Sequence, residues 1–277
     1  MKQDSAAYAG VVARAVVSGL GVSVVSLILI PIGIVTLFRA RRLYSGIASW
    51  TCRCVLRIYG VRVRVVAADT GELFSTRQVV YISNHTSTLD LFVLVALRLP
   101  NCRFFLSGFL RKFVPLGIIS SMMGTFFTVP QNRPAERVRI FQRADCTLRR
   151  TGESVYLSPE GGRITTGDVG RFNRGAFHLA TSLQVPIVPF YIQIPRGCDP
   201  GLGYDARPGF VTVHGMPAID TSGWTLDQVD RNRDRVRDLF VQMHQALGAG
   251  DSALQTLGAG RPALHEHDGQ ELQHEVA

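Results

Sequence analysis

A histidine and an aspartate lie five residues apart where a predicted strand ends. The segment from Asn84 to Asp90 reads Asn-His-Thr-Ser-Thr-Leu-Asp and follows the apolar run 79–82. His85 can take up a proton near neutral pH, and Asp90 is the nearest group able to orient its ring. Open α/β sheets present reactive groups at the carboxyl ends of their strands. The spacing therefore predicts a histidine base for a substrate hydroxyl.

The same segment also fits an ordinary helix start. Thr86, Ser87 or Thr88 can cap the helix, and Asp90 is favourably placed in its first turn. His85 is then a hydrogen-bonded loop residue without a catalytic role. A His-x4-Asp spacing arises by chance in roughly one of three chains of this composition. Further motifs are therefore needed to distinguish a catalytic pair from an ordinary helix start.

A second polar segment follows another predicted strand. Residues 158–163 read Ser-Pro-Glu-Gly-Gly-Arg and come directly after Val155-Tyr156-Leu157. Adjacent glycines allow a tight loop whose N–H groups converge on an anion, and the guanidinium of Arg163, oriented by Glu160, can grip a phosphate. Taken alone, the segment equally fits a surface turn with a solvated arginine.

These two segments need a sheet to position them, and the chain predicts an α/β fold with a mainly parallel sheet flanked by helices. Short β-rich runs alternate with helical patterns, which is typical of such sheets. The candidate strands are 61–67, 78–83, 103–107, 125–129, 154–158, 185–194 and 210–214.

Two of the covering helices have clear sequence boundaries. Pro134 opens a helix that ends before Gly152, and its inward residues are Val138, Phe141 and Leu148. Thr225 and Gln228 form a predicted capping box for a later helix, whose buried stripe is Val229, Val236, Phe240, Met243 and Leu247.

The first sixty residues predict contact with a membrane. The 24 residues from Ala15 to Phe38 carry no charge, and a helix of that length spans about 36 Å, enough to cross a bilayer. Pro31 and Gly33 lie inside the run and leave a re-entrant or interfacial helical hairpin as an alternative. Three arginines at positions 39, 41 and 42 follow and favour a cytosolic main domain.

The next segment has the pattern of a helix lying in the membrane interface. Between Ser5 and Ala68 the chain has eight arginines and no acidic residue, which suits anionic headgroups. An ordinary helix packed on the domain, with solvated arginines, fits equally well. The apolar residues at three- and four-residue spacing are Leu43, Ile47, Trp50, Cys54 and Ile58.

Composition narrows the partners and the domain layout. The net charge is +9, but the basic residues are not interleaved with aromatic ones as in nucleic-acid-binding motifs, so a lipid or other polyanion fits better. The five cysteines have neither metal-ligand nor C-x-x-C spacing, and neither zinc nor a disulfide framework is expected. We expect membrane-associated helices over 1–60, an α/β domain over 61–247 and a disordered tail over 248–277.

Together, the two polar segments and the run Val185-Pro186-Ile187-Val188-Pro189 resemble the glycerolipid acyltransferase family, the lysophosphatidic acid acyltransferases and their relatives. That family is marked by NHxSxxD, PEGxR and VPIVP blocks in this order. The segment 172–177, Phe-Asn-Arg-Gly-Ala-Phe, is similar to the family's FKxGAF segment. The resemblance covers roughly residues 60–215 and is far more specific than any one block.

The resemblance implies an O-acyltransferase that moves a fatty acyl group from acyl-CoA or acyl-carrier protein to the hydroxyl of a lysophospholipid. The leading acceptor is 1-acyl-sn-glycerol-3-phosphate, giving phosphatidic acid, and another lysophospholipid or an aminolipid is the alternative. His85 and Asp90 become the catalytic pair. No metal and no cofactor besides the acyl donor are expected. The implied substrate-binding residues are Asn84, Ser87, Glu160, Gly161, Gly162, Arg163 and Arg174.

The implied location is the cytoplasmic membrane, with the active site facing the cytosol. The implied partners are the bilayer, the lysophospholipid and the acyl donor, without nucleic acid. Both lipid substrates are most concentrated at the bilayer surface, which gives the apolar N-terminus a purpose.

One block departs from the family pattern. The family has a basic residue after a strand and a GxxFIxR run, whereas the segments 105–109 and 124–130 lack both the lysine and the arginine. Arg111, Lys112 or Arg133 can substitute from nearby positions. Gly162 also replaces the usual threonine of PEGTR, which loosens the loop. The acceptor is therefore less well determined than the reaction.

Other functional classes fit less well. A serine hydrolase needs a G-x-S-x-G elbow, and a P-loop needs Lys-Ser/Thr after its second glycine; the chain has neither arrangement beside its candidate residues. A non-catalytic, membrane-anchored lipid-binding module remains the second alternative.

Overall fold

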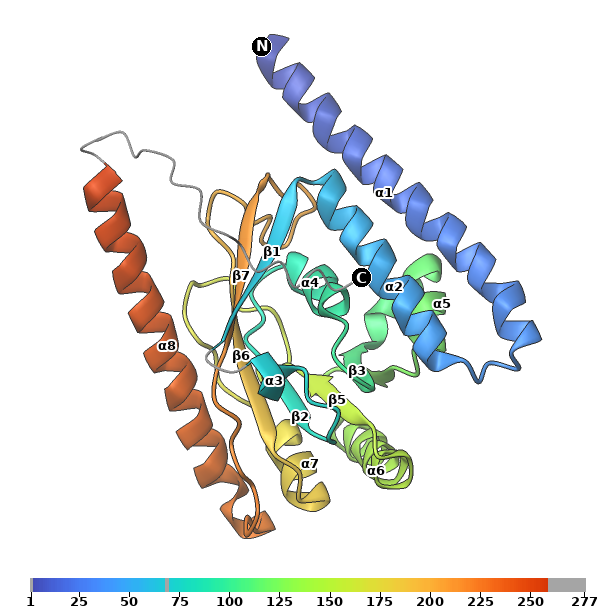
Figure 1. The fold of residues 1–277 in the computed structure, drawn as a ribbon, viewed down its shortest axis with the longest axis vertical. Coiled ribbons are helices and arrows are strands. Elements are labelled where there is room, and N and C mark those ends of the chain that lie inside the picture. The colour runs from blue at the N-terminus through green and yellow to red at the C-terminus, as the bar shows by residue number, and fades with distance from the viewer. Residues whose placement is uncertain (1, 68–69, 259–277) are drawn as a thin grey trace.

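A seven-stranded sheet forms the centre of the computed structural model, which describes residues 2–67 and 70–258 (Figure 1). The strand order is β1-β7-β6-β2-β5-β3-β4, and every pair is parallel except the antiparallel β6 and β7. The predicted mainly parallel sheet is confirmed, and each strand ends within two residues of its expected bounds. The strands are β1 (Val61–Ala67), β2 (Val80–Ser83), β3 (Cys102–Ser107), β4 (Phe126–Thr128), β5 (Ser154–Leu157), β6 (Ile187–Gln193) and β7 (Gly209–Gly215).

Helices cover both faces of the sheet. One hydrophobic cluster joins α1, α2, α4 and α5 to the sheet, and a second joins α6, α7 and α8 to its other face. Because β2 and β5 are covered on both sides, all of their residues are buried. The helices are α1 (Lys2–Val35), α2 (Arg41–Ile58), α3 (Thr70–Leu73), α4 (Leu89–Leu97), α5 (Val114–Met122), α6 (Pro134–Thr151), α7 (Gly175–Leu183) and α8 (Val229–Gly258), with 3₁₀ turns η1 (Gly108–Lys112) and η2 (Leu226–Gln228).

Helix α6 has the predicted bounds but a shorter buried stripe. It starts at Pro134 and stops before Gly152, whose φ of +64° ends the helix. Leu148 is fully buried and Phe141 is partly buried. The prediction for Val138 is wrong, since this side chain is 55% exposed. The first turns of α6 lie beside β4, an edge strand of three residues that offers little surface to cover them.

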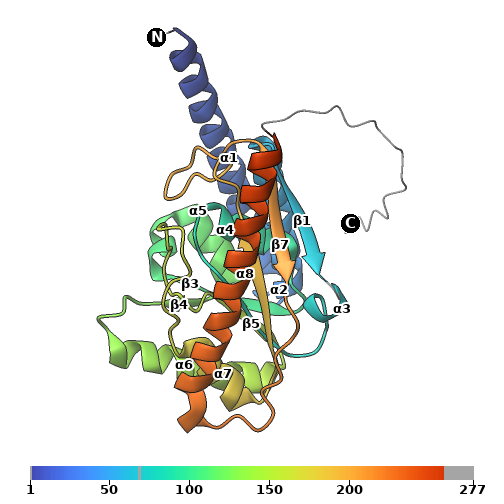
Figure 2. The ribbon, with the colours of Figure 1, turned by 90° about the vertical axis from the view of Figure 1, so that its left-hand side faces the viewer.

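Helix α8, which crosses in front of the sheet in Figure 2, begins and ends differently from the prediction. Its expected buried stripe is confirmed at Val229, Val236 and Phe240, and Met243 and Leu247 are partly buried. The predicted capping box does not form, because the turn η2 intervenes and the Thr225 side chain makes no cap hydrogen bond.

The tail expected over 248–277 begins inside helix α8. Helix α8 continues through Gly248 to Gly258, because extending an existing helix costs much less than nucleating one. Residues 259–277 lie outside the described part of the chain.

Helices α1 and α2 form an antiparallel hairpin along one side of the molecule (Figure 1). Pro31 lies inside α1 without ending it, and the chain turns at Leu37 and Phe38, whose φ angles are 51° and 55°. By length and composition Tyr8–Val35 can cross a membrane, with a mean hydropathy of 2.4. The Ser26 hydroxyl donates to the carbonyl of Pro115 at 2.8 Å and joins α1 to α5.

Helix α2 combines both alternatives considered for it. It buries Tyr44 and Val55 in the domain core, while Leu43 and Trp50 on its outer face are exposed. The helix is thus packed on the domain and still presents apolar side chains to its surroundings.

Candidate active site

The His85–Asp90 pair forms between the loop that follows β2 and the first turn of α4. His85 Nδ1 lies 2.8 Å from Asp90 Oδ2. The Asp90 side chain is fully buried, whereas that of His85 is 29% exposed. Because an ionised carboxylate only accepts hydrogen bonds, the bond places a proton on Nδ1 and leaves the lone pair on Nε2. The arrangement suits a general base that takes a proton from outside the loop.

The helix-start features occur at the same place. Asp90 Oδ2 also accepts from the backbone N–H groups of Thr86 at 2.7 Å and Ser87 at 2.9 Å. Ser87 Oγ accepts from the N–H of Leu89. The two interpretations of the segment are therefore compatible, because one carboxylate holds the loop and the imidazole together.

Asn84 links the loop to the neighbouring strand. Its Nδ2 donates to the carbonyl of Ile192 at 2.9 Å, and its Oδ1 accepts from the Ile192 N–H at 2.7 Å. Both ends of the buried amide are used inside the protein. Asn84 and the buried Ser87 were predicted to bind substrate, but the structure places them in the scaffold of the loop.

Glu160 connects the two polar segments. Its Oε2 accepts from the backbone N–H of His85 at 2.6 Å, and its Oε1 accepts from the N–H of Gly170 at 2.9 Å. Burial raises the pKa of Glu160 above its ordinary value, while these two N–H groups act in the opposite direction. Glu160 was expected to orient Arg163, but its side chain instead holds the loop of His85.

The glycines after Glu160 have different roles. Gly161 has a φ of +69°, and a Cβ atom there would lie 2.7 Å from Nδ2 of Asn173. That amide donates to the carbonyls of Pro159 and Glu160. Gly162 has open space around it. The first glycine is thus required by the loop, and the second leaves room beside Arg163.

Arg163 lies next to the histidine loop, as predicted. Its Nη1 donates to Thr88 Oγ1 at 2.6 Å, and the side chain is exposed. Within the described chain, the backbone N–H groups of Gly162 and Arg163 donate to no acceptor, so they and the guanidinium are available to an anion. Sequence reasoning missed Thr88 as a binding partner, although its place three residues after His85 was a signal.

Arg174 is not brought to this group of residues by its described contacts. Its Nε donates to Asp230 Oδ1 at 2.6 Å, and its Nη2 contacts Oδ2 of the same residue. Its side chain is 66% exposed. The predicted substrate ligand therefore joins the start of α7 to α8.

The block that departs from the family pattern, residues 105–109 and 124–130, lies at the ends of β3 and β4. Because these strands are parallel to β2, their carboxyl ends point to the same side of the sheet as His85. The guanidinium of Arg111, just after β3, lies 4.4 Å from the ring centre of Phe127. Arg133 instead pairs with Glu136. Lys112, the third candidate substitute, lies over the ring of Phe109 at 5.6 Å from Nζ to the ring centre.

Across residues 2–67 and 70–258, no group of three or more His, Cys, Asp or Glu side chains is arranged to hold a metal ion.

Comparisons with known proteins agree with this geometry. The profile of the family described as Acyltransferase matches residues 64–193. The mouse 1-acyl-sn-glycerol-3-phosphate acyltransferase alpha is 30% identical over 220 residues, which cover 75% of this chain and 74% of the mouse protein. The chain belongs to the glycerolipid acyltransferase family.

Further relatives of this acyltransferase support the same assignment. The yeast 1-acyl-sn-glycerol-3-phosphate acyltransferase is 28% identical over 211 residues, covering 73% of this chain and 68% of the yeast protein. The crystal structure of the lysophosphatidic acid acyltransferase PlsC from Thermotoga maritima has a TM-score of 0.63 and 19% identity, covering 85% of this chain and 98% of that one. The fold is thus that of PlsC, and the enzyme is an O-acyltransferase.

Proposed function

We propose that the enzyme transfers a fatty acyl group from acyl-CoA or acyl-carrier protein to the hydroxyl of 1-acyl-sn-glycerol-3-phosphate, giving phosphatidic acid. The single observation that carries this proposal is the 2.8 Å bond between His85 Nδ1 and the buried Asp90, which leaves Nε2 as the base. The acceptor follows the relatives, which are named for this substrate.

In the proposed mechanism, His85 Nε2 removes the proton of the acceptor hydroxyl as its oxygen attacks the thioester carbonyl. The new ester bond forms, the C–S bond breaks, and the thiolate leaves with the proton from the imidazolium. Asp90 keeps the proton on Nδ1 and stabilises the imidazolium. No acyl-enzyme is needed, because the two substrates react directly.

Arg163 would hold the acceptor phosphate next to this base. The guanidinium is exposed, bonded to Thr88 and flanked by two free N–H groups. Glu160 and Asn84 act as positioning residues, because each connects the histidine loop to another segment. Positioning is essential here, since general-base catalysis typically contributes only about 10²- to 10⁴-fold.

A different acceptor lipid is the alternative, because the block that departs from the family pattern lacks the family's basic residues. The segments 105–109 and 124–130 lack the usual lysine and arginine, and Arg111 lies over the ring of Phe127. Another lysophospholipid or an aminolipid is therefore the alternative substrate.

One experiment distinguishes these acceptors. Membranes containing the protein are given one radiolabelled acyl donor and a panel of lysolipids with phosphate, choline, ethanolamine or glycerol headgroups. We expect transfer to be fastest with 1-acyl-sn-glycerol-3-phosphate. Faster transfer to a lysolipid with another headgroup would show that this lipid is the acceptor. A lack of transfer to all of them would favour a non-catalytic binding module.

We further propose that the α1–α2 hairpin holds the enzyme on the bilayer, with the sheet domain in the cytosol. Leu20 and Leu27 on α1 and Trp50 on α2 are exposed apolar side chains. Replacing Leu20 and Leu27 by glutamate should shift the protein from the membrane pellet to the supernatant in low-salt sedimentation assays. An unchanged distribution would show that anchoring lies elsewhere.

A further inference from the structure

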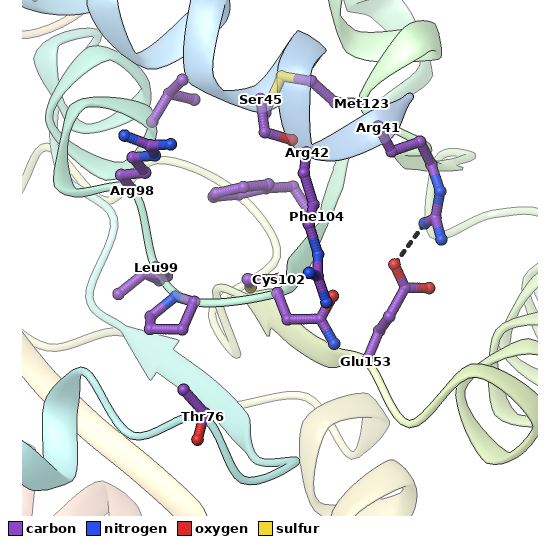
Figure 3. A pocket seen from close by; sticks show the side chains of 13 residues that line it. Arg41, Arg42, Ser45, Thr76, Arg98, Leu99, Cys102, Phe104, Met123 and Glu153 are labelled. Carbon is purple, nitrogen blue, oxygen red and sulfur yellow. Dashed lines mark ion pairs between the residues drawn. The ribbon is translucent and has the colours of Figure 1, made fainter. Parts of the chain in front are cut away.

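A cavity of about 340 Å³ lies beside the amino ends of β3 and β5 (Figure 3). It is enclosed by the start of α2, the end of α4 and the residues that precede β3 and β5. His85 follows the carboxyl end of β2, whereas Cys102 and Glu153 lie at the amino ends of parallel strands. The cavity is therefore separate from the candidate active site.

The arginines of this cavity carry more charge than the described structure neutralises. Arg41 pairs with Glu153 at 2.6 Å (Figure 3), and the same carboxylate pairs with Arg103 at 2.7 Å. Arg42 and Arg98 also line the cavity, but neither side chain forms an ion pair or hydrogen bond with the described residues. Within residues 2–67 and 70–258, these two guanidinium groups thus have no counter-charge.

The start of α2 adds to this positive potential. Its first turn contains Arg41 and Arg42 and no acidic residue, and its N-cap, Ala40, supplies no side-chain hydrogen bond. Cations at the amino end of a helix oppose the helix dipole, whereas an anion there is stabilised. A bound anion would offset both the dipole and the unpaired arginines.

A second hollow continues the basic surface. It shares Arg41 and Arg42 with the cavity and adds Arg39 to the lining. Arg42 thus lines both hollows.

The cavity wall indicates what kind of anion fits. Val95, Leu99, Phe104 and Met123 contribute an apolar lining, which a small inorganic anion does not need. A phospholipid has both a phosphate for the arginines and apolar atoms for this wall. The outer face of α2, with exposed Leu43 and Trp50, is also where we propose contact with the bilayer.

We propose that this cavity binds the phosphate-containing headgroup of an anionic phospholipid, with Arg42 and Arg98 as its charged ligands. That the ligand carries a phosphate is inferred from the cavity alone. That this ligand is a lipid also rests on the membrane contact proposed above. Such a site would fix the position of the sheet domain relative to the lipid surface.

The test is calorimetric titration of the full chain in a zwitterionic detergent. The probes are dihexanoyl phosphatidylglycerol, dihexanoyl phosphatidylcholine and inorganic phosphate. We expect saturable binding of phosphatidylglycerol, and a Kd raised about tenfold or more by Arg42→Gln with Arg98→Gln, because charge-assisted bonds to phosphate are lost. Arg57→Gln with Arg62→Gln removes the same charge outside the cavity and should change Kd less than about twofold.

A second variant tests the cavity itself without a change of charge. Ser45 lines the cavity, and Ser45→Phe should fill it and weaken phosphatidylglycerol binding. An unchanged Kd in both Ser45→Phe and the Arg42/Arg98 double variant would overturn the site. Equal affinity for phosphatidylcholine would overturn the role of charge, and equal affinity for inorganic phosphate would overturn the lipid source.

His85→Ala separates this proposal from the proposed function. The variant should lose acyl transfer and keep wild-type affinity for phosphatidylglycerol. Loss of phosphatidylglycerol binding in His85→Ala would show that the lipid occupies the active site, and would overturn the separate site.

Discussion

At the scale of single residues, the proposed reaction depends on the carboxylate of Asp90, which accepts several hydrogen bonds. Asp90 Oδ2 accepts from the His85 ring and from two backbone N–H groups. Within the described chain its second oxygen, Oδ1, is buried without a partner. The ionised carboxylate is thus held mainly through one oxygen, so a change at Asp90 affects the base and the loop together.

The first prediction concerns the base. His85→Ala should lower the rate of acyl transfer by about 10²-fold or more, because the variant loses the proposed general base. Transfer from a radiolabelled donor in isolated membranes measures this rate. His178, an exposed histidine on α7, provides the matched control, and His178→Ala should keep its activity. Undiminished turnover in His85→Ala would refute the mechanism.

The second prediction concerns the proposed phosphate ligand. Arg163→Ala should raise the KM for the lysophospholipid about tenfold or more and leave the KM for the acyl donor near its wild-type value, since a charge-assisted bond to the acceptor is lost. Initial rates at varied acceptor and donor concentrations separate the two effects. Arg171 is an exposed arginine of the same loop, and Arg171→Ala serves as control. A selective loss of donor affinity would contradict the assignment.

At the scale of elements, the site is made by loops that side chains hold to one another. Glu160 connects the loop after β5 to the loop after β2, and Asn84 connects the latter to β6. The three sequence blocks of the family therefore meet at one place because each one follows or forms a neighbouring strand of the sheet.

The third prediction compares two adjacent glycines in this arrangement. Gly161→Ala places a Cβ atom at positive φ and against Asn173, and the left-handed backbone alone costs about 1–2 kcal/mol. Gly162→Ala meets open space and should be nearly neutral. Thermal unfolding and transfer assays should show lower stability and activity for Gly161→Ala only. Equal effects of both substitutions would contradict the different roles assigned to them.

Much of the secondary structure was predictable from sequence, because strands and helix ends have local sequence patterns. The bounds of α6 follow from Pro134 and Gly152, and the order of the strands' apolar runs indicated the parallel sheet. The position of Val138 was not predictable, since its exposure depends on how short β4 is. The bond between Glu160 and the backbone of His85 joins residues 75 positions apart, and backbone donors leave no trace in a sequence.

The same reason explains why the ion pair of Arg174 was not predicted. An arginine inside a family-like block suggested a ligand, but its carboxylate partner, Asp230, belongs to a distant helix. The His85–Asp90 pair, by contrast, was predictable because the two residues are only five positions apart, His85 in the loop after β2 and Asp90 in the first turn of α4.

At the scale of the whole molecule, the sheet separates two regions of different chemistry. The candidate active site lies at the carboxyl ends of the central parallel strands, and the arginine-lined cavity lies at their amino ends. The hairpin of α1 and α2 runs along the side of the sheet domain (Figure 1). Glu153 stabilises this assembly, because it ties α2 to β3 and β5 through Arg41 and Arg103.

The fourth prediction concerns that carboxylate and its pH dependence. Burial opposes ionisation of Glu153, but hydrogen bonds from Arg41 and Arg103 hold its pKa below the ordinary value of 4.5. Its contribution to stability is therefore fully present above pH 4.5 and is lost as the pH falls through the lower folded-state pKa. Glu153→Gln should lower the unfolding free energy by about 2 kcal/mol at pH 7.

The difference in unfolding free energy between wild type and Glu153→Gln should shrink near pH 3, which is about one unit or more below the ordinary pKa of a glutamate side chain. Glu136→Gln is the control, because Glu136 forms an exposed pair with Arg133 and should cost less than about 0.5 kcal/mol. A difference that stays constant between pH 7 and the acid range would contradict the role of the Glu153 charge.

The bond from the Ile192 amide to Asn84 makes one backbone proton a sensor of the histidine loop. Ile192 belongs to β6, yet its N–H donates to a side chain rather than to another strand. Exchange of this amide with deuterium therefore requires the loop to leave the sheet, while its neighbours in β6 remain protected by the ladder. Comparing their exchange rates with and without bound acceptor would measure how firmly a substrate closes the loop around the base.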